Sequence, residues 1–189
     1  MPHPHHSRAH SRRRFALLAA VALFVSACHG SATASGGTSM DLTSSSFSNG
    51  QIPLDYTCDG ANRSPQLAWS QPPAATRALA LTVTDPDAPF GTFTHWVLFN
   101  LPAATRSLPE DVPTDSQLPD GTLQGRNDFH NTGYGGPCPP RGSTHRYVFT
   151  LYALDAPLAL APGSTRKQLE SALAGHILAH AQLTARYSR

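Results

Sequence analysis

The 189-residue sequence has no apolar run long enough to cross a lipid bilayer as a permanent helix. Its longest apolar stretch runs from Phe15 to Val25, whereas a spanning helix needs about 20 residues. The sequence also lacks a Gly-x-Ser-x-Gly turn and any internal repeat. These absences argue against a membrane-spanning protein, a serine hydrolase of the nucleophile-elbow type and a repeat protein.

Basic side chains are scarce beyond the N-terminal region. Of the 14 Lys and Arg residues, four precede Cys28, and none of the 12 acidic residues does, which leaves 14 − 4 = 10 basic against 12 acidic side chains. The chain from Cys28 onward therefore carries a formal charge of −2, and its basic residues form no stripe. Nucleic acid is accordingly not expected as a partner.

Residues 1–27 have the composition of an export signal rather than of a folded domain. A basic region (Arg8, Arg12, Arg13 and Arg14) precedes the apolar run, and small residues follow it. The segment Val25-Ser26-Ala27-Cys28 resembles a bacterial lipobox, which would make Cys28 the first mature residue and the site of lipid attachment. Two alternatives stay open: an ordinary secretory signal with a chance cysteine, and twin-arginine export suggested by residues 11–15.

The expected location follows from that signal. Residues 28–40 are rich in Gly, Ser, Ala and Thr, which predicts a flexible tether between a lipid anchor and the folded domain at 41–189. We expect a lipoprotein of the cell envelope, exposed outside the cytoplasm. By analogy with other lipoproteins, His29 after Cys28 favours the outer membrane in a cell that has one.

The domain at 41–189 is predicted to be mainly β. Residues 79–85 alternate apolar and polar side chains, and both faces of 95–101 and 145–155 are largely apolar, which indicates central strands. Along 95–101, the period of two places Leu101 with His95, Val97 and Phe99. Prolines and glycines break the region between the second and third strands into loops. A β-sandwich with one or two short helices is the expected architecture.

The C-terminal part predicts one helix and one closing strand. Ser164 is the expected N-cap, Leu169 and Leu173 would stack on one face, and Gly175 would end the helix. Residues 177–187 then alternate, which indicates a strand. A continued helix is the alternative, because alanines favour helices.

One carboxylate and two imidazoles are the candidate functional groups. Asp85 ends an apolar strand face, where an unpaired charge would cost several kcal/mol. His95 and His145 each begin a strand beside a Gly/Pro loop, so they are the expected partners of Asp85. Tyr147 should share a strand face with His145 and present its hydroxyl to the same hole. This grouping is suited to binding a compact anion.

The glycines and prolines nearby should complete the site. Residues 133–137 (Gly-Tyr-Gly-Gly-Pro) would let backbone N–H groups approach a ligand closely, and the prolines would keep the rim rigid. Asp87 is expected to hold its turn through backbone N–H groups.

Other roles for these residues remain open. The two histidines could be structural partners of Asp85, or the three could form a metal site, although neither histidine belongs to a His-x-His or His-x3-His pair. An acid–base enzyme using Asp85 and His145 is a further alternative, but the chain shows no nucleophile motif. Cys58 and Cys138 could form a disulfide in an exported protein, or could pack separately.

Several separated motifs resemble the phosphatidylethanolamine-binding protein family, in particular its bacterial Raf-kinase-inhibitor-like branch. They occur in the family's order and span nearly all of 41–189. The motifs are Asp85-Pro86-Asp87-Ala88-Pro89, His95-Trp96-Val97, Gly136-Pro137-Cys138-Pro139-Pro140, His145-Arg146-Tyr147, Tyr56-Thr57-Cys58-Asp59-Gly60 with Ser64-Pro65, and Gly125-Arg126-Asn127-Asp128-Phe129.

The resemblance implies a β-sandwich with a pocket for phosphate-like headgroups and no catalytic residue, metal or cofactor. Inhibition of an envelope protease or another protein is the alternative function. The segment between Pro89 and His95 is shorter than in eukaryotic relatives, so an aromatic wall of their pocket is either absent or replaced by Phe90 or Phe93. Carried over residue by residue, the pocket would consist of Asp85, Pro89, His95, Gly136, Pro139, Pro140, His145 and Tyr147.

Overall fold

A computed structural model describes residues 39–189. The expected signal at 1–27, the expected lipid attachment at Cys28 and all but the last two residues of the expected tether lie outside this range. Met40 is buried in the core, with only 5% of its surface exposed. The packed domain therefore includes at least one residue that the composition had assigned to the tether.

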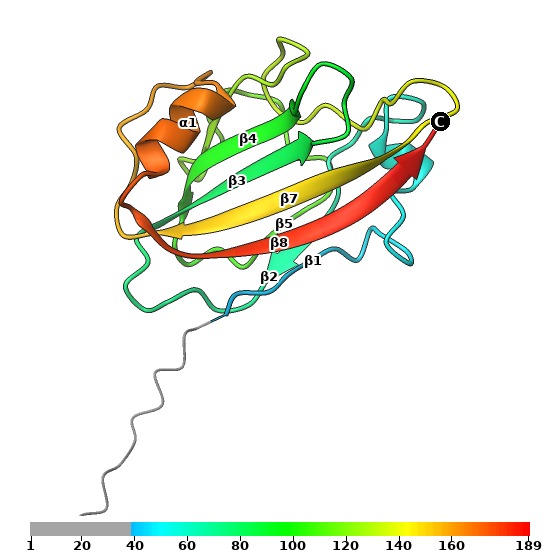
Figure 1. The fold of residues 1–189 in the computed structure, drawn as a ribbon. Helices are drawn as coiled ribbons and strands as arrows, with labels where there is room; N and C mark the ends of the chain where they lie inside the picture. The colour runs from blue at the N-terminus through cyan, green and yellow to red at the C-terminus, as the bar shows by residue number, and fades with distance from the viewer. Residues whose placement is uncertain (1–38) are drawn as a thin grey trace, which may run out of the picture. The chain divides into compact units, whose positions relative to one another are not determined.

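The described chain forms two antiparallel sheets with one α-helix, which confirms the predicted mainly-β class (Figure 1). The smaller sheet has the order β1-β2-β5, and the larger has the order β6-β4-β3-β7-β8. The elements are β1 Leu42–Thr43, the 3₁₀ helix η1 Leu54–Tyr56, β2 Leu67–Trp69, β3 Ala78–Asp85, β4 Phe93–Pro102, β5 Ser107–Leu108, β6 Leu123–Gln124, β7 Thr144–Leu154, α1 Arg166–Leu173 and β8 Ile177–Ser188.

The main core lies between the two sheets. Leu67 and Trp69 of β2 face it from the smaller sheet, and Leu81, Leu98 and Phe149 belong to the same buried cluster from the larger one. Each fully buried side chain of this size contributes roughly 1.5–3 kcal/mol to folding. The expected sandwich is therefore the observed one.

A second core lies under α1, on the other face of the larger sheet. Leu169 and Leu173 pack there with Val97 and Phe99 of β4 and with Leu154 of β7. Both faces of β4 and β7 are therefore covered near the helix, as their two-sided apolar pattern predicts. Figure 1 shows α1 lying across the sheet at the end opposite the C-terminus.

Strand β4 departs from the expected face assignment at its C-terminal end. Leu101 packs in the core between the sheets, whereas Val97 and Phe99 pack under α1. Asn100 has φ 57°, and the register with β3 shifts between Leu79 and Leu81. This irregularity moves Leu101 to the other face, so the simple period of two gave the wrong side for that residue.

The C-terminal elements match the prediction except for the helix cap. Thr165, not Ser164, is the N-cap, and it forms a capping box with Gln168. Gly175 follows the helix with φ 83°, a conformation that glycine adopts at little cost. Residues Ile177–Ser188 form β8, which pairs along its length with β7, and the alternative of a continued helix is wrong.

Strand direction brings four chain segments to one end of the larger sheet. Strand β3 ends there and β4 begins there, while β7 begins and β8 ends there, because neighbouring strands run antiparallel. The C-terminus lies at this end of the molecule (Figure 1). The candidate site occupies this end.

Candidate functional site

Asp85 is the last residue of β3 and is buried, with 4% of its surface exposed. Both of its carboxylate oxygens have partners. Oδ1 accepts a hydrogen bond from the backbone N–H of Asp87 at 2.9 Å, and Oδ2 lies 2.7 Å from Nδ1 of His145. The buried carboxylate is therefore fully satisfied, as its place at the end of an apolar row requires.

His145 is the second residue of β7 and is also buried. Because the Asp85 carboxylate accepts hydrogen bonds, the His145 nitrogen facing it, Nδ1, carries the proton. This contact fixes the ring orientation and leaves Nε2 for another partner. His145 lines the cavity described below.

His95 reaches the same region through a β-bulge. Val83 pairs with Trp96 but Thr84 pairs with Thr94, so His95 is the extra residue on β4. Its Nδ1–H donates to the carbonyl oxygen of Gly135 at 2.6 Å. Burial lowers the pKa of His95 below its ordinary value, so the free protein holds this imidazole neutral at neutral pH, with Nε2 unprotonated.

These three side chains line one cavity of about 590 Å³. Six of the eight predicted pocket residues contribute to its wall: Asp85, Pro89, His95, Pro139, Pro140 and His145. The walls are otherwise largely apolar. Three chain segments that are far apart in sequence therefore meet at one cavity, as expected from the strand ends that gather at this end of the larger sheet.

Gly136 is not among the residues that line this cavity, and its expected contact with a ligand stays a prediction. Its N–H donates to Oδ1 of Asn62 at 2.7 Å, and Gly135 N–H donates to the carbonyl of His95 at 2.9 Å. A Cβ at Gly136 would lie 2.6 Å from Asn62 Oδ1 and from Tyr56 O, so the absence of a side chain serves close packing. The glycine backbone therefore supports the site.

Tyr147 also lies outside the cavity wall. Its side chain is fully buried, and its ring packs edge-on against His95 with centroids 5.2 Å apart. Its hydroxyl is buried beside the backbone N–H of Cys138, a residue of the cavity wall, but does not meet the full geometry of a hydrogen bond with any described residue. Burial raises the pKa of this phenol, which stays protonated. Tyr147 packs against the ring of His95, and the expectation that its hydroxyl contacts a ligand stays a prediction.

Asp87 fixes the rim in a different way from the expected turn. Its carboxylate accepts bonds from Arg146, at 2.8 Å from the backbone N and at 2.9 and 2.6 Å from guanidinium nitrogens. The guanidinium lowers the pKa of Asp87 to about 2. The turn after β3 is thus tied to β7 beside His145.

Aromatic side chains form much of the remaining wall. Phe90 and Phe93 both line the cavity, which favours the alternative that they replace the aromatic wall over its absence. Phe129 packs against Phe93 with centroids 4.7 Å apart and against His95 at 5.4 Å. Phe90 is fully exposed on the rim.

Two further cavity residues, Arg189 and His130, were not selected from the sequence. Neither belongs to a Gly/Pro motif, and His130 was expected to be an ordinary loop residue. Arg189 directly follows β8, and the end of β8 pairs with the start of β7, where His145 lies. Knowledge of this strand pairing would have been needed to predict that Arg189 reaches the cavity.

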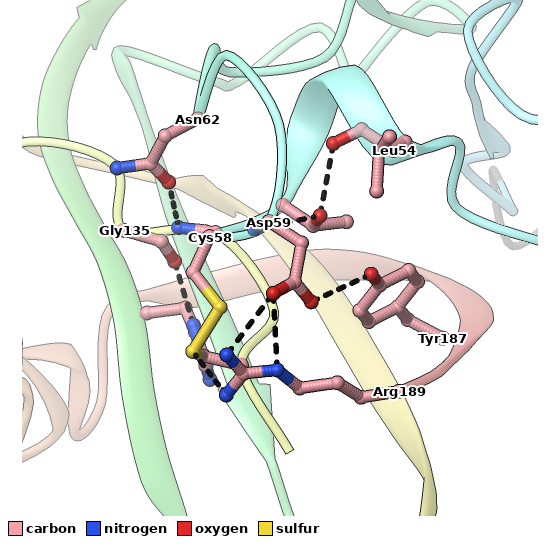
Figure 2. Close-up of a disulfide and its surroundings, with 11 residues drawn as sticks. Leu54, Cys58, Asp59, Asn62, Gly135, Tyr187 and Arg189 are labelled. Atoms are coloured by element: carbon pink, nitrogen blue, oxygen red, sulfur yellow. Dashed lines mark hydrogen bonds and ion pairs between the residues drawn. A yellow bond between two sulfur atoms is a disulfide. The ribbon is translucent and has the colours of Figure 1, made fainter. Parts of the chain in front are cut away.

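Cys58 and Cys138 form a disulfide, with Cα atoms 5.4 Å apart. Cys138 lines the cavity, whereas Cys58 follows η1, so the bond joins the cavity wall to a distant segment. Figure 2 shows Asp59, next to Cys58, between Tyr187 and Arg189. Two strand-end residues therefore converge on the disulfide loop.

Within residues 39–189, no three His, Cys, Asp or Glu side chains are grouped so as to hold a metal ion. The metal-site alternative for Asp85, His95 and His145 therefore has no support from their arrangement. In the same range, no helix combines the length and apolarity needed to cross a bilayer.

Fold and site together define a β-sandwich protein with a histidine-lined cavity at the strand ends of its larger sheet. The family model described as phosphatidylethanolamine-binding protein matches residues 43–188. The chain belongs to this family, which confirms the predicted family membership.

Relatives from archaea and bacteria are similar over most of the chain. A UPF0098 protein of Methanothermobacter thermautotrophicus is 48% identical over 151 residues, covering 79% of this chain and 99% of that protein. The solved structure of YbcL from Escherichia coli, described as a member of the mammalian PEBP family, matches with TM-score 0.74 and 35% identity, covering 79% and 98%. CT736 of Chlamydia trachomatis, a putative PEBP homologue by its description, matches with TM-score 0.72 and 39% identity, covering 80% and 98%.

Proposed function

We propose that this protein binds a small anion or a phosphorylated headgroup in the cavity between Asp85, His95 and His145. The observation that carries the proposal is the Asp85–His145 contact of 2.7 Å at the wall of a cavity of about 590 Å³. It orients one imidazole with Nε2 available, while His95 is oriented by Gly135. Two oriented imidazoles suit an anion that presents a hydroxyl as well as acceptor oxygens, such as a monoprotonated phosphate.

The two histidines would contribute differently. His145 donates its Nδ1–H to the carboxylate of Asp85, which leaves Nε2 as the ring atom that would meet the anion. His95 is neutral in the free protein, so its Nε2 would accept the proton of a monoprotonated phosphate or take up a proton on binding. Charge-assisted hydrogen bonds contribute roughly 1.5–3 kcal/mol each. Two or three of them supply about 3–9 kcal/mol, which after association costs of about 4 kcal/mol or more corresponds to dissociation constants in the submillimolar range or weaker.

Isothermal titration with phosphate, phosphoethanolamine and acetate tests the proposal. His145→Ala should weaken phosphate binding at least about tenfold, because it removes one charge-assisted bond. His176→Ala is the matched control: His176 also pairs with an aspartate, Asp155 at 2.8 Å, but does not line the cavity. Equal affinity of the wild type and the folded His145 variant would reject the proposal. So would turnover of phosphomonoesters that Asp85→Asn abolishes, because it would make the site catalytic.

We also propose that Cys28 carries the lipid that holds the protein in the cell envelope. The support is the lipobox-like segment 25–28 after a short apolar run. Three acyl chains, at about 0.8 kcal/mol per buried methylene, would make anchoring effectively permanent. Mass spectrometry of the mature protein and membrane fractionation test this point. Cys28→Ala should remove the acyl mass and release the protein from membranes, and an unchanged distribution would contradict it.

A second candidate function is an interaction module that inhibits an envelope protein through the cavity rim. The observation that favours it is Phe90, fully exposed on that rim. Crosslinking in intact cells would test it. A crosslinked product lost in Phe90→Ala but retained in Leu54→Ala, an exposed apolar residue away from the cavity, would support this function. Equal products from both variants would reject it.

A further inference from the structure

We infer that Arg189 is a third anion-contacting group of the cavity, and that Asp59 and the Cys58–Cys138 disulfide hold its guanidinium in place. This inference rests on the proposed anion-binding function and specifies the ligand: a tetrahedral oxyanion such as a phosphomonoester, in preference to a planar carboxylate. It concerns residues that none of the sequence motifs around Asp85, His95 or His145 contains.

The backbone of Arg189 is fastened to the segment that leads into His145. Its N–H donates to the carbonyl of Ser143 at 3.2 Å, and the N–H of Gly142 donates to the carbonyl of Arg189 at 2.6 Å. The side chain lines the cavity together with His145 and is 26% exposed. The guanidinium is therefore partly exposed to solvent, on a residue of the same cavity wall as His145.

Asp59 sets the direction of this guanidinium. Its Oδ1 accepts from Nε of Arg189 at 3.1 Å and lies 3.0 Å from Nη2, while its Oδ2 accepts from the hydroxyl of Tyr187 at 2.9 Å. Figure 2 shows this arrangement around the sulfur atoms. Because the carboxylate is held from both sides, the side chain of Arg189 has little freedom to swing into solvent.

Arg189 retains donors for a ligand. A guanidinium has five N–H groups, of which two point to Asp59 and one, on Nη1, contacts Sγ of Cys138 at 3.4 Å. Sulfur is a weak acceptor, so a ligand oxygen can replace it. Asp59 offsets much of the positive charge, and the contribution of Arg189 is therefore directional hydrogen bonding. A tetrahedral anion has oxygens for the imidazoles and another for the guanidinium, whereas a carboxylate has only two.

The disulfide connects this arrangement to the cavity. Cys58 is adjacent to Asp59, and Cys138 contributes to the cavity wall and contacts Arg189. The disulfide thus ties Asp59, whose carboxylate orients the guanidinium, to the loop that forms the cavity wall. Loss of the bond should loosen Arg189 before it affects the Asp85–His145 pair, which lies on adjacent strand ends.

Titration calorimetry of the full chain with phosphate and acetate tests the inference. Arg189→Ala should weaken phosphate binding about tenfold, the effect of one charged hydrogen bond, and change acetate binding less than twofold. Arg189→Lys should fall between, because an ammonium keeps the charge but not the planar fork. Arg141→Ala is the control: it removes an exposed arginine next to the rim that does not line the cavity, and both affinities should stay unchanged.

Asp59→Asn provides a second readout, because Asp59 does not line the cavity and would affect a ligand through Arg189. It should lower the ratio of phosphate to acetate affinity several-fold, and combining it with Arg189→Ala should add no further loss. A general structural effect would lower both affinities together. Arg189→Ala with wild-type selectivity would overturn the inference, and would leave the proposed function standing if His145→Ala still abolishes binding. Failure of the wild type to bind phosphate would instead reject the proposed function itself.

Discussion

Removal of the Cys58–Cys138 disulfide should lower the free energy of unfolding by an amount that the topology of the chain sets. The two cysteines are 80 residues apart in sequence. In the chain-entropy treatment, a closed loop of this length restricts the unfolded state by about 4.5 kcal/mol at room temperature. Engineered and native bonds commonly deliver less, so a loss between about 2 and 4.5 kcal/mol is expected.

The fold should survive this loss, because other contacts join the same two loops. The N–H of Cys58 donates to the carbonyl of Pro137 at 3.1 Å, and Gly136 N–H donates to Asn62. The core between the sheets does not include either cysteine. We therefore expect a cooperative transition at lower denaturant concentration, with a smaller free energy of unfolding.

Urea unfolding followed by tryptophan fluorescence measures this change, because Trp69 and Trp96 are both buried. The variant Cys58→Ser/Cys138→Ser and the wild type treated with a dithiol should agree within experimental error. A loss below about 1 kcal/mol for the double variant would refute the reasoning, since it would mean that the loop is not constrained by the bond. A much larger loss in the double variant than on reduction would also refute it, because the serines would then act through packing.

Three further predictions concern groups around the site and the helix. Burial lowers the pKa of His95. The contribution of the neutral imidazole to stability is therefore complete above the unfolded-state pKa of about 6.5 and declines as the pH falls below that value. His95→Gln should flatten the dependence of urea midpoints on pH between about 8 and 5. A midpoint difference between the two proteins that is independent of pH would contradict this. The pKa of Asp87 is lowered to about 2 by Arg146, so its contribution is present above about 3.8 and is lost as the pH falls toward 2. Because the side chain of Asp87 is 29% exposed, Asp87→Asn should lower the free energy of unfolding by no more than about 1 kcal/mol. If the variant were less stable by the same amount at every pH in an acid titration, the ion pair with Arg146 would not be the source of the stabilisation. Thr165→Ala should cost about 1 kcal/mol in thermal unfolding by removing the capping box with Gln168, and an unchanged melting temperature would contradict the cap assignment.

Much of the fold was accessible from sequence because its strands are long and strongly patterned. The apolar runs at 79–85 and 145–155 correspond to β3 and β7 within one residue at each end, and the alternation at 177–187 corresponds to β8. The loops between β4 and β7 follow from proline and glycine, which restrict the backbone whatever surrounds them. The short strands β1, β5 and β6, of two residues each, leave no periodic signal.

The pairing of Asp85 with a histidine could be predicted for an energetic reason. A carboxylate at the end of an apolar strand face needs a partner, and His145 begins a strand of similar composition. His95 shows where this reasoning ends. Its bulge was not visible in the sequence, because the register shift depends on how β4 pairs with β3. The same limitation placed Leu101 on the wrong face.

By itself, the sequence determined the class of the domain, the order of its main strands, the family and the side chains that need buried partners. The class, the strands and the need for buried partners follow from local periodicity and from the cost of burying charge, which act along the chain, whereas the family was indicated by motifs that resemble those of its members. The tertiary structure decided which hydrogen-bond donors remain available to a ligand. The N–H of Gly136 donates to Asn62, and Tyr147 is buried against the ring of His95. Arg189 lies at the cavity rim, where Asp59 accepts its hydrogen bond. Such choices depend on the distances between segments distant in sequence, which only strand register and packing determine.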